Sequence, residues 1–418
     1  FACARLGAAL VPLNWRLSIE ELRWIEEDAG LALLVAGDAA HPFALDFRAR
    51  RPADGLAPGG ADAVGLAGAP GRAAPLLIGY TSGTTGRPKG AVLTQAAFAA
   101  NAANARVLFD LTAADRVLTV LPMFHVGGLN IQTVPALIHG ATVILHDRFD
   151  PDAFFDAVER DRPTLSLLVP AVMAALVGHP RWERADLSSL RAIGAGSSDV
   201  PLSLIEAFHA RGVPVQQVYG ATETSPIAIA QTREEALAAP GSIGRAVPGV
   251  EARIAPGTGE IRVRGDVVMS SYLNDPGATA AALRDGWFAT GDVGRVDEQG
   301  RYWFTDRLKH LIISGGENIS PAEVERVLST APGVREGAVV GRPDARWGEV
   351  PVAVVVPGEG FDPGRMLAHF EGRLARFKQP RDVVVMEALP RTALGKVAVA
   401  ELREVVRASP PPLAGGGW

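Results

Sequence analysis

Short apolar segments alternate with amphipathic stretches along the first half of the chain. The apolar segments are LLIGY (76–80), RVLTVLP (116–122), ATVILH (141–146), TLSLLVP (164–170) and LRAIGAG (190–196). The Ala-rich amphipathic stretches at 94–108 and 201–211 are typical of helices. Strands that alternate with helices in this way predict a parallel α/β construction.

Three regions depart from this alternation of strands and helices. Residues 48–75 are rich in Ala, Gly, Pro and Arg, which predicts a loop or linker. From Glu260 the segments EIRVRG and GRVDEQGRYWFTD predict the short strands of a β-subdomain. After Lys309 a new βα pattern begins, with a helix at 321–329 that has proline in its first turn and with the strands GAVVGRP and VPVAVVVP.

These patterns predict the domain organisation. We expect a large N-terminal domain over 1–308, made of stacked α/β subdomains plus a β-subdomain. A small α+β domain follows over 309–408, and the tail SPPPLAGGGW predicts disorder over 409–418. Because the chain begins at Phe1 with no charged leader, we expect no signal peptide and a missing natural start, which lowers the expected stability of the N-terminal subdomain.

Composition limits the classes of partner. A chain of 418 residues has room for two or three domains, and its formal net charge of -5 does not favour nucleic acid or an anionic membrane. The single cysteine, Cys3, excludes an internal disulfide and a cysteine-clustered metal site, which fits a reducing cytoplasm. The longest apolar run, 165–178, is too short to span a bilayer. We expect a soluble cytoplasmic protein with a small-molecule partner, and a homodimer stays open.

Residues 80–90, YTSGTTGRPKG, contain three glycines, four Ser or Thr residues and no carboxylate. Glycines let the backbone approach a ligand, and successive amides with hydroxyls form a concave set of donors suited to phosphate, to which Lys89 adds positive charge. The phosphate loop of kinases and GTPases requires G-x-x-x-x-G-K-[ST], whereas here Pro88 precedes the lysine and Gly90 follows it. By itself the stretch is equally typical of a polar surface turn.

Two further motifs follow apolar strands. LPMFHVGG (121–128) places His125 beside glycines at the end of a strand, which is typical of a pocket wall or of a packed histidine. YGATET (219–224) places Tyr219, Thr222 and Glu223 beyond a strand, where ligands of open α/β sheets lie. An aromatic plane suits a nucleotide base, a hydroxyl suits a phosphate and a carboxylate suits Mg²⁺. The alternative interpretation of YGATET is a helix N-cap with an acidic residue in the first turn.

The last three motifs lie in the second half of the chain. WFATGDVG (287–294) offers Asp292 as an acceptor for a ribose diol or as a turn residue. DRLKHLIISGGENISPAEVE (306–325) combines cations, an apolar strand and paired glycines at a domain junction. PRTALGK (390–396) ends in a lysine that, taken alone, is typical of a solvated side chain.

In this order and at these separations, the motifs resemble those of the adenylate-forming superfamily over essentially the whole chain. That superfamily contains acyl- and aryl-CoA synthetases, firefly luciferase and the adenylation domains of nonribosomal peptide synthetases. SGGENISPAEVE and MFHVGGLNIQTVPAL are most similar to bacterial fatty-acyl-CoA synthetases, with 4-coumarate, feruloyl and benzoate CoA ligases near by. The resemblance implies that MgATP and a carboxylic acid form an acyl-adenylate and pyrophosphate, after which the CoA thiol displaces AMP.

The resemblance also implies roles for individual residues. The β- and γ-phosphates contact Thr81, Ser82, Gly83, Thr84, Thr85, Gly86 and Lys89. The other nucleotide contacts are Gly196, Ser197, Tyr219 and Gly220 at adenine, Thr222 at the α-phosphate, Glu223 at Mg²⁺, and Asp292 and Arg307 at the ribose. Relatives often carry GGAP beside adenine where this chain has GSSD (196–199), so the local turn is expected to differ.

For the small domain, the resemblance implies a mobile lid that rotates between the two steps. Lys396 bridges the acyl carboxylate and the α-phosphate, and it forms the catalytic set with Thr222, Glu223 and His125. Lys309 is the hinge. The predicted CoA contacts are Gly315 and Gly316 at the pantetheine channel and Trp347 and Phe377 at the nucleotide, where either aromatic residue is equally typical of a core position.

The identity of the acid is predicted from the segments HVGGLN and SPIAIA. The predicted acyl pocket consists of His125, Val126, Gly127, Thr224, Ser225 and Ile227. Neither segment contains Lys or Arg for a second carboxylate, or Asp for an amino group. We therefore expect a medium- or long-chain fatty acid, with an aryl acid such as a cinnamate as the alternative. A luciferase-like monooxygenase and a non-catalytic nucleotide-binding relic are remote alternatives.

Overall fold

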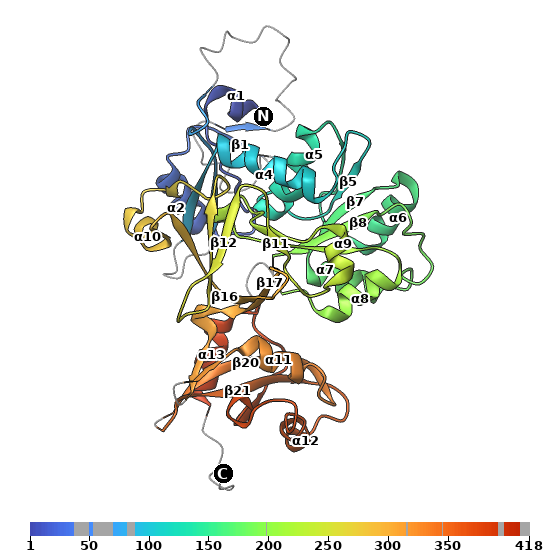
Figure 1. Ribbon diagram of the computed structural model, residues 1–418, viewed down its shortest axis with the longest axis vertical. Helices are drawn as coiled ribbons and strands as arrows, with labels where there is room; N and C mark the ends of the chain where they lie inside the picture. The colour runs from blue at the N-terminus through green and yellow to red at the C-terminus, as the bar shows by residue number, and fades with distance from the viewer. Residues whose placement is uncertain are drawn as a thin grey trace. The chain divides into compact units, whose positions relative to one another are not determined.

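The computed structural model describes residues 1–36, 50–52, 70–81, 88–197, 199–314, 317–344, 346–391 and 397–409 (Figure 1). The chain divides into two compact units. The first consists of Phe1–Arg253, Ile261–Thr290 and Val296–Trp303. The second consists of Ile254–Glu260, Gly291–Arg295 and the chain from Phe304 onward.

A seven-stranded sheet is the largest sheet that the described residues of the first unit form, and its order is β11-β10-β9-β8-β7-β5-β6. Its parallel strands are β5 (Arg116–Thr119), β6 (Thr142–Leu145), β7 (Leu165–Leu168), β8 (Ala192–Gly196) and β9 (Val215–Tyr219). The antiparallel strands are β10 (Ile229–Ala230) and β11 (Arg245–Ala246). Strands β7 and β8 are buried along their whole length, as in a parallel sheet covered on both faces. Their residues are apolar or glycine except Ser166, whose hydroxyl donates to the Leu118 carbonyl. The predicted parallel α/β construction is confirmed for the segments at 116–122, 141–146, 164–170 and 190–196. The segment LLIGY (76–80) instead forms an antiparallel strand.

The helices of the first unit begin at recognisable caps. Thr94 caps α4 (Gln95–Leu108) by accepting a hydrogen bond from the Ala97 N–H at 3.2 Å, and Asp150 caps α6 at 2.9 Å. Helices α7 and α8 contact each other beside the sheet (Figure 1). The remaining bounds are α1 (Ala2–Leu6), α2 (Ile19–Ala29), α5 (Val134–Ile138), α6 (Pro151–Asp161), α7 (Pro170–Val177), α8 (Leu202–Ala210), α9 (Arg233–Ala238) and α10 (Pro276–Ala282). The helices predicted at 94–108 and 201–211 are confirmed within one residue.

Smaller sheets complete the first unit. Strands β3 (Pro75–Thr81), β4 (Lys89–Thr94) and β14 (Ser271–Tyr272) form a three-stranded antiparallel sheet in the order β14-β4-β3. Strand β2 (Arg50–Pro52) lies parallel to β1 (Leu34–Ala36). The loop predicted over 48–75 is therefore wrong at 50–52, because pairing with a distant strand supplies backbone partners that local composition does not reveal.

Several strands of another sheet contain residues of both compact units. Its order is β12-β13-β16-β15, and β17 pairs with β16. The bounds are β12 (Val250–Ile254), β13 (Glu260–Gly265), β15 (Leu283–Arg284), β16 (Trp287–Val296) and β17 (Tyr302–Arg307). The predicted strand EIRVRG coincides with β13.

The second unit has a five-stranded sheet with a core on each face. The sheet order is β19-β18-β21-β20, with β22 paired to β21. Its elements are β18 (Ile312–Ser314), β19 (Glu317–Ile319), β20 (Val334–Asp344), β21 (Gly348–Pro357), β22 (Asp382–Val385), α11 (Pro321–Leu328), α12 (Pro363–Ala368) and α13 (Val399–Ala408). In β21, Ala353 and Val355 pack with residues of α11 and α12, whereas Val352 and Val354 pack with residues of α13. This two-sided burial explains the unbroken apolar run VPVAVVVP.

In the described parts of the chain, no helix combines the length and the apolar character needed to cross a lipid bilayer.

Candidate functional site

A hairpin holds the two ends of the segment 82–87. Thr81 is the last residue of β3 and Lys89 is the first residue of β4, and the two are paired in register. The predicted phosphate contacts Ser82, Gly83, Thr84, Thr85 and Gly86 lie outside the described residues. The antiparallel ladder therefore fixes the backbone on both sides of this segment.

Tyr272 contacts both Lys89 and Glu223. It pairs with Ala91 of β4, its ring centroid lies 5.6 Å from Lys89 Nζ, and its hydroxyl donates a 2.7 Å hydrogen bond to Glu223 Oε1. Glu223 is only 8% exposed, so this donor stabilises a buried carboxylate. Burial and the neighbouring Glu223 carboxylate raise the pKa of Tyr272, which keeps the phenol protonated as the donor.

No sequence motif singles out Tyr272. The residue lies in the two-residue strand β14, in the segment SSYLN, which has no glycine-rich, charged or periodic pattern. Its contact with Glu223 joins residues 49 positions apart. Only the pairing of β14 with β4 brings the phenol to the carboxylate, and no local signal in the sequence predicts that pairing.

The YGATET segment forms a tight turn after β9. Tyr219 is the last residue of the strand, and Glu223 lies in the single-turn helix η3 (Thr222–Thr224). The alternative of a helix N-cap with its first-turn acid holds in part, because Glu223 lies in the first turn of η3. The N-cap is Ala221, whose side chain has no hydrogen-bonding group. A Cβ at Gly220 would lie 1.8 Å from the Pro226 carbonyl oxygen, so the turn closes only around glycine.

Two predicted site segments meet at β3, and a third lies against one of them. A Cβ at Gly79 would lie 2.5 Å from Thr222 Cγ2 and 3.8 Å from Val126 Cγ1, so glycine in the strand lets both side chains approach. A Cβ at Gly127 would lie 3.4 Å from Ser197 Oγ. The structure therefore brings Val126, Gly127, Thr222 and Ser197 into one region of the first unit, although they are separated widely in the sequence.

His125 lies in a turn and not at the end of a strand as expected. Strand β5 ends at Thr119, and Pro122, which has no N–H to continue a ladder, begins the turn that leads to His125. The half-buried His125 ring contacts Phe124 edge-on, with a centroid distance of 4.7 Å. The π-helix η2 (Gly127–Thr133) follows directly. Such helices are rare and occur frequently at functional sites.

The predicted acyl-pocket residues of the η3 turn use their polar groups inside the fold. Thr224 Oγ1 accepts from the Ala221 N–H at 2.9 Å, and Ser225 Oγ donates to the Val267 carbonyl at 2.7 Å. Ile227 is fully buried. At Thr224 and Ser225, the described hydroxyl contacts are thus with the backbone and serve to hold the turn.

Two buried asparagines connect this turn to η2. Asn101 of α4 accepts from the Ile227 N–H at 3.2 Å and donates to the Asn130 carbonyl at 2.6 Å. Asn130 in turn donates to the Ser225 carbonyl at 2.6 Å. Sequence analysis missed both residues, although a polar residue in the Ala-rich stretch 94–108 was an available signal for Asn101. The network fixes the π-helix against the η3 turn.

The GSSD segment begins at the end of β8. A Cβ at Gly196 would lie 2.3 Å from the Val218 carbonyl oxygen, so the neighbouring strand requires glycine here. Ser197 is exposed and has φ 69°, a left-handed conformation that glycine adopts more readily than other residues. The chain thus holds a residue other than glycine in the left-handed region directly after β8.

In the second unit, the two predicted ribose contacts form an ion pair. Arg307 Nε lies 2.6 Å from Asp292 Oδ1, and Asp292 is buried whereas Arg307 is exposed. Lys309 belongs to the single-turn helix η4 (Leu308–His310). Gly315, Gly316 and Lys396 lie outside the described residues. They are flanked by the register pair Ser314↔Glu317 and by the bridge Arg391↔Val397.

Two guanidinium groups lie near the ring of Trp347. Its ring centroid is 4.9 Å from Arg346 Cζ and 5.2 Å from Arg381 Cζ. Asp344 accepts backbone hydrogen bonds from Trp347 and Arg346, which fixes the turn and lowers the pKa of Asp344. The second predicted aromatic residue, Phe377 of η5 (Arg376–Lys378), is 38% exposed. Arg346 and Arg381 were not singled out from the sequence, because isolated arginines are usual on any surface.

Comparison with known proteins extends these local observations to the whole chain. Residues 1–273 match the family described as AMP-binding enzyme, and residues 323–396 match the AMP-binding enzyme C-terminal domain. An indoleacetate–CoA ligase of Aromatoleum aromaticum is 50% identical, over 97% of this chain and 85% of the ligase. A feruloyl-CoA synthase of Amycolatopsis sp. is 42% identical, over 96% of this chain and 85% of the synthase.

Solved structures agree with this relationship. An o-succinylbenzoate CoA synthetase of Bacillus subtilis, in complex with its acyl-adenylate intermediate, superposes with a TM-score of 0.88 at 34% identity, over 99% of this chain and 86% of that chain. The same synthetase is also known in complex with ATP and magnesium, with a TM-score of 0.86 at 34% identity, over 96% of this chain and 85% of that chain. Together with the motifs and their geometry, these similarities show that the chain belongs to the AMP-binding enzymes, the adenylate-forming family.

Proposed function

We propose that this AMP-forming acid–CoA ligase joins an aryl or aryl-alkanoic acid to CoA. The enzyme uses ATP with magnesium to activate the acid, and CoA accepts the acyl group. The aryl class was the alternative in sequence analysis, and two relatives that match nearly the whole chain act, by their names, on indoleacetate and ferulate. A long-chain fatty acid is the second candidate, because a fatty-acid–CoA ligase of Mycobacterium tuberculosis is 34% identical over 98% of this chain.

The observation that carries the acid class is the uncharged wall formed by Val126 and Gly127. Val126 lies near Gly79 of β3, as Thr222 does, and Gly127 lies near Ser197. The adjoining segments 125–130 and 225–230 contain no Lys or Arg. Such a wall contributes about 25 cal/mol for each Å² of apolar acid surface that it covers, and it offers nothing to offset the desolvation of a second carboxylate. An apolar monocarboxylic acid therefore suits it better than a dicarboxylic acid.

The first half-reaction forms a carboxylate-oxygen to α-phosphorus bond and breaks the bond to pyrophosphate. The barrier is charge crowding, because the anionic carboxylate approaches an anionic phosphate, so cations and oriented N–H groups supply most of the stabilisation. We assign the β- and γ-phosphates to residues 81–86 and Lys89, and the α-phosphate to Thr222. Asp292 and Arg307 would hold the ribose, and Lys396 would bridge the carboxylate and the α-phosphate.

Glu223 fits the role of the magnesium ligand. Mg²⁺ prefers oxygen ligands and is usually held by one or two carboxylates together with substrate phosphates and waters. Glu223 offers a buried carboxylate held in place by the Tyr272 hydroxyl at 2.7 Å. Among the residues that the structure describes, no cluster of three or more His, Cys, Asp or Glu side chains forms a metal site by itself. Magnesium would therefore neutralise phosphate charge as part of MgATP.

In the second half-reaction the CoA sulfur bonds to the acyl carbon and AMP leaves. We propose that the lid over 309–408 rotates at Lys309 before this step and that Gly315 and Gly316 flank the pantetheine channel. Trp347, with Arg346 and Arg381 beside its ring, offers an aromatic face and positive charge to the nucleotide part of CoA. Phe377 would contact the same part of CoA.

A panel of acids tests the proposed function. Acid-dependent pyrophosphate release and thioester formation would be measured with indole-3-acetate, phenylacetate, ferulate, cinnamate, octanoate, palmitate, acetate and malonate. We expect the highest kcat/KM with one of the first four acids. A preference for octanoate or palmitate would favour the fatty-acid alternative, and a preference for acetate or malonate would contradict the uncharged apolar wall.

A further inference from the structure

Gln132 is a buried polar residue whose role the chemistry above does not explain. It lies in η2, and its side chain is 3% exposed. Within the described part of the chain, neither its amide nitrogen nor its amide oxygen has a hydrogen-bond partner. An unsatisfied buried polar group usually costs about 1–3 kcal/mol of stability. A residue kept at that cost requires a reason such as a ligand or an ordered water.

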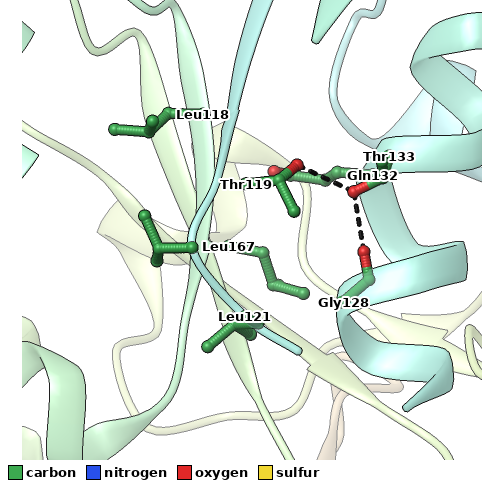
Figure 2. Close-up of a pocket in the computed structure, with 8 residues that line it drawn as sticks. Leu118, Thr119, Leu121, Gly128, Gln132, Thr133 and Leu167 are labelled. Carbon is green, nitrogen blue, oxygen red and sulfur yellow. Dashed lines mark hydrogen bonds between the residues drawn. The ribbon is translucent and has the colours of Figure 1, made fainter. Parts of the chain in front are cut away.

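The Gln132 carboxamide lies at a small cavity between η2 and the parallel sheet. The cavity has a volume of about 10 Å³, which is close to the space that one water molecule needs. Figure 2 shows Gln132 and Thr133 on the helix side and Leu118 and Leu167 on the strand side. Thr119 and Thr133 bond to each other at 2.8 Å, and Thr133 also donates to the Gly128 carbonyl at 2.6 Å. The threonine hydroxyls are therefore engaged, whereas the glutamine amide is available.

The cavity and the proposed acid wall are adjacent along η2. Gly127 of that wall lies next to Ser197, and the following residue, Gly128, lines the cavity. Gly194 and Gly196 lie on the same face of β8, because side-chain positions in a strand alternate. A Cβ at Gly194 would lie 3.3 Å from Gln132 Nε2. Gln132 thus lies against Gly194 of β8, and Gly127 lies against Ser197, the residue that follows the same strand.

We propose that Gln132 is a specificity-determining residue at the inner end of the acid-binding site. The cavity accommodates one water molecule. This water accepts a hydrogen bond from a ring N–H or O–H group of the acid and is itself hydrogen-bonded to the Gln132 carboxamide. A carboxamide both donates and accepts, so it satisfies that water whichever way the amide is turned. This inference rests on the proposed function, and it narrows the acid to aryl acids with a hydrogen-bond donor on the ring.

Two acids of the same shape separate this polar contact from simple burial. Indole-3-acetate has a ring N–H, and 1-benzothiophene-3-acetate has sulfur in its place. A site built to bond a substrate N–H or O–H discriminates strongly against an analogue that lacks it, because the site's own polar group is left unpaired. We expect wild-type kcat/KM to favour the indole acid by about tenfold or more.

The variants are Gln132→Leu and Gln132→Met, with Gln216→Leu as the matched control. Gln216 is also buried, but its amide donates to the Leu108 carbonyl at 2.8 Å and to the Gln231 carbonyl at 3.0 Å. In both Gln132 variants we expect the ratio between the two acids to fall to near one, with an unchanged or higher Tm because an unpaired amide is removed. The control should lose Tm and keep the ratio.

The outcomes distinguish this inference from the proposed function. If wild type makes thioester from aryl acids but both Gln132 variants keep the ratio, or if the control loses it equally, the inference is wrong and the function stands. Lower Tm with equal loss on both acids in the Gln132 variants would show a purely structural role and would also overturn it. If wild type makes no thioester from any acid of the panel, the proposed function fails and the inference fails with it.

Discussion

The contact between Tyr272 and Glu223 is tested by Tyr272→Phe. The substitution removes one oxygen atom and keeps the ring whose centroid lies 5.6 Å from Lys89 Nζ. It therefore leaves the packing of β14 on β4 in place and deletes only the 2.7 Å hydrogen bond to Glu223 Oε1. The affected group is a carboxylate that is 8% exposed, so little solvent is available to replace the lost donor.

The expected magnitude follows from that burial. Hydrogen bonds to charged groups contribute about 1.5–3 kcal/mol, and about 1.4 kcal/mol corresponds to tenfold in a rate or equilibrium constant. If the phenol orients Glu223 for magnesium, acid-dependent pyrophosphate exchange should fall by about 10- to 100-fold. Binding of MgATP, measured by calorimetry without acid, should weaken. Conversion of supplied acyl-adenylate to thioester should be unchanged, because no pyrophosphate leaves in that step.

Tyr302→Phe is the matched control. The Tyr302 hydroxyl also donates at 2.7 Å, but it does so to the backbone carbonyl of Ala252. Both variants should lose about 1 kcal/mol or more in the free energy of unfolding, because each leaves a shielded acceptor without its donor. Only Tyr272→Phe should lose pyrophosphate exchange and MgATP affinity. The reasoning is refuted if exchange in Tyr272→Phe stays within twofold of wild type, or if Tyr302→Phe loses as much.

Three other predictions concern the lid and the stability of the first unit. Lys396→Ala should raise the adenylation barrier by about 2 kcal/mol or more, but the variant should still convert supplied acyl-adenylate to thioester. Gly316→Leu should keep pyrophosphate exchange and lose thioester formation. If both variants lose the two activities equally, these roles are wrong. Burial alone would raise the pKa of Asp115, but hydrogen bonds from Arg191 and other donors outweigh burial and hold the pKa below its ordinary value. The ionised Asp115 therefore stabilises the folded state fully above about pH 4, and this stabilisation is lost as the pH falls through the lowered pKa. Asp115→Asn should therefore lower the urea unfolding free energy by about 1.5–3 kcal/mol at pH 6, and a difference from wild type that does not shrink below about pH 4 would contradict this reasoning. Arg381→Ala should raise the KM for CoA severalfold with pyrophosphate exchange unchanged, and loss of exchange would place Arg381 outside the CoA site.

Much of the framework was predictable because burial leaves a direct record in the sequence. The strand VPVAVVVP is apolar at successive positions because both of its faces are covered. Helix α4 begins at the expected Thr94, whose hydroxyl caps it. Such constraints act on single residues or on regular spacings, so they are visible without coordinates.

The contacts that sequence analysis missed depend on pairs of distant residues. Tyr272 and Glu223 are 49 positions apart, and Asn130 and Ser225 are 95 positions apart. Each residue alone is unremarkable in type, and the strand pairing or helix packing that brings the partners together leaves no local pattern. Gln132 is the extreme case, because its significance lies in the lack of a protein partner for a buried amide within the described residues. Only coordinates reveal such a lack.

The missed residues explain how an apolar wall can select one acid among many. Covering apolar surface discriminates weakly between acids of similar size, since each methylene contributes only about 0.8 kcal/mol. Strong selection requires a wall that does not adjust to the wrong acid. The bonds from Asn101 to Asn130 and from Asn130 to Ser225 provide that rigidity, because they fix η2 against the turn that carries Glu223. In the proposed site, a fixed wall with a single polar group at its inner end would discriminate by hydrogen bonding as well as by size. The same network holds the wall beside the carboxylate proposed to hold MgATP.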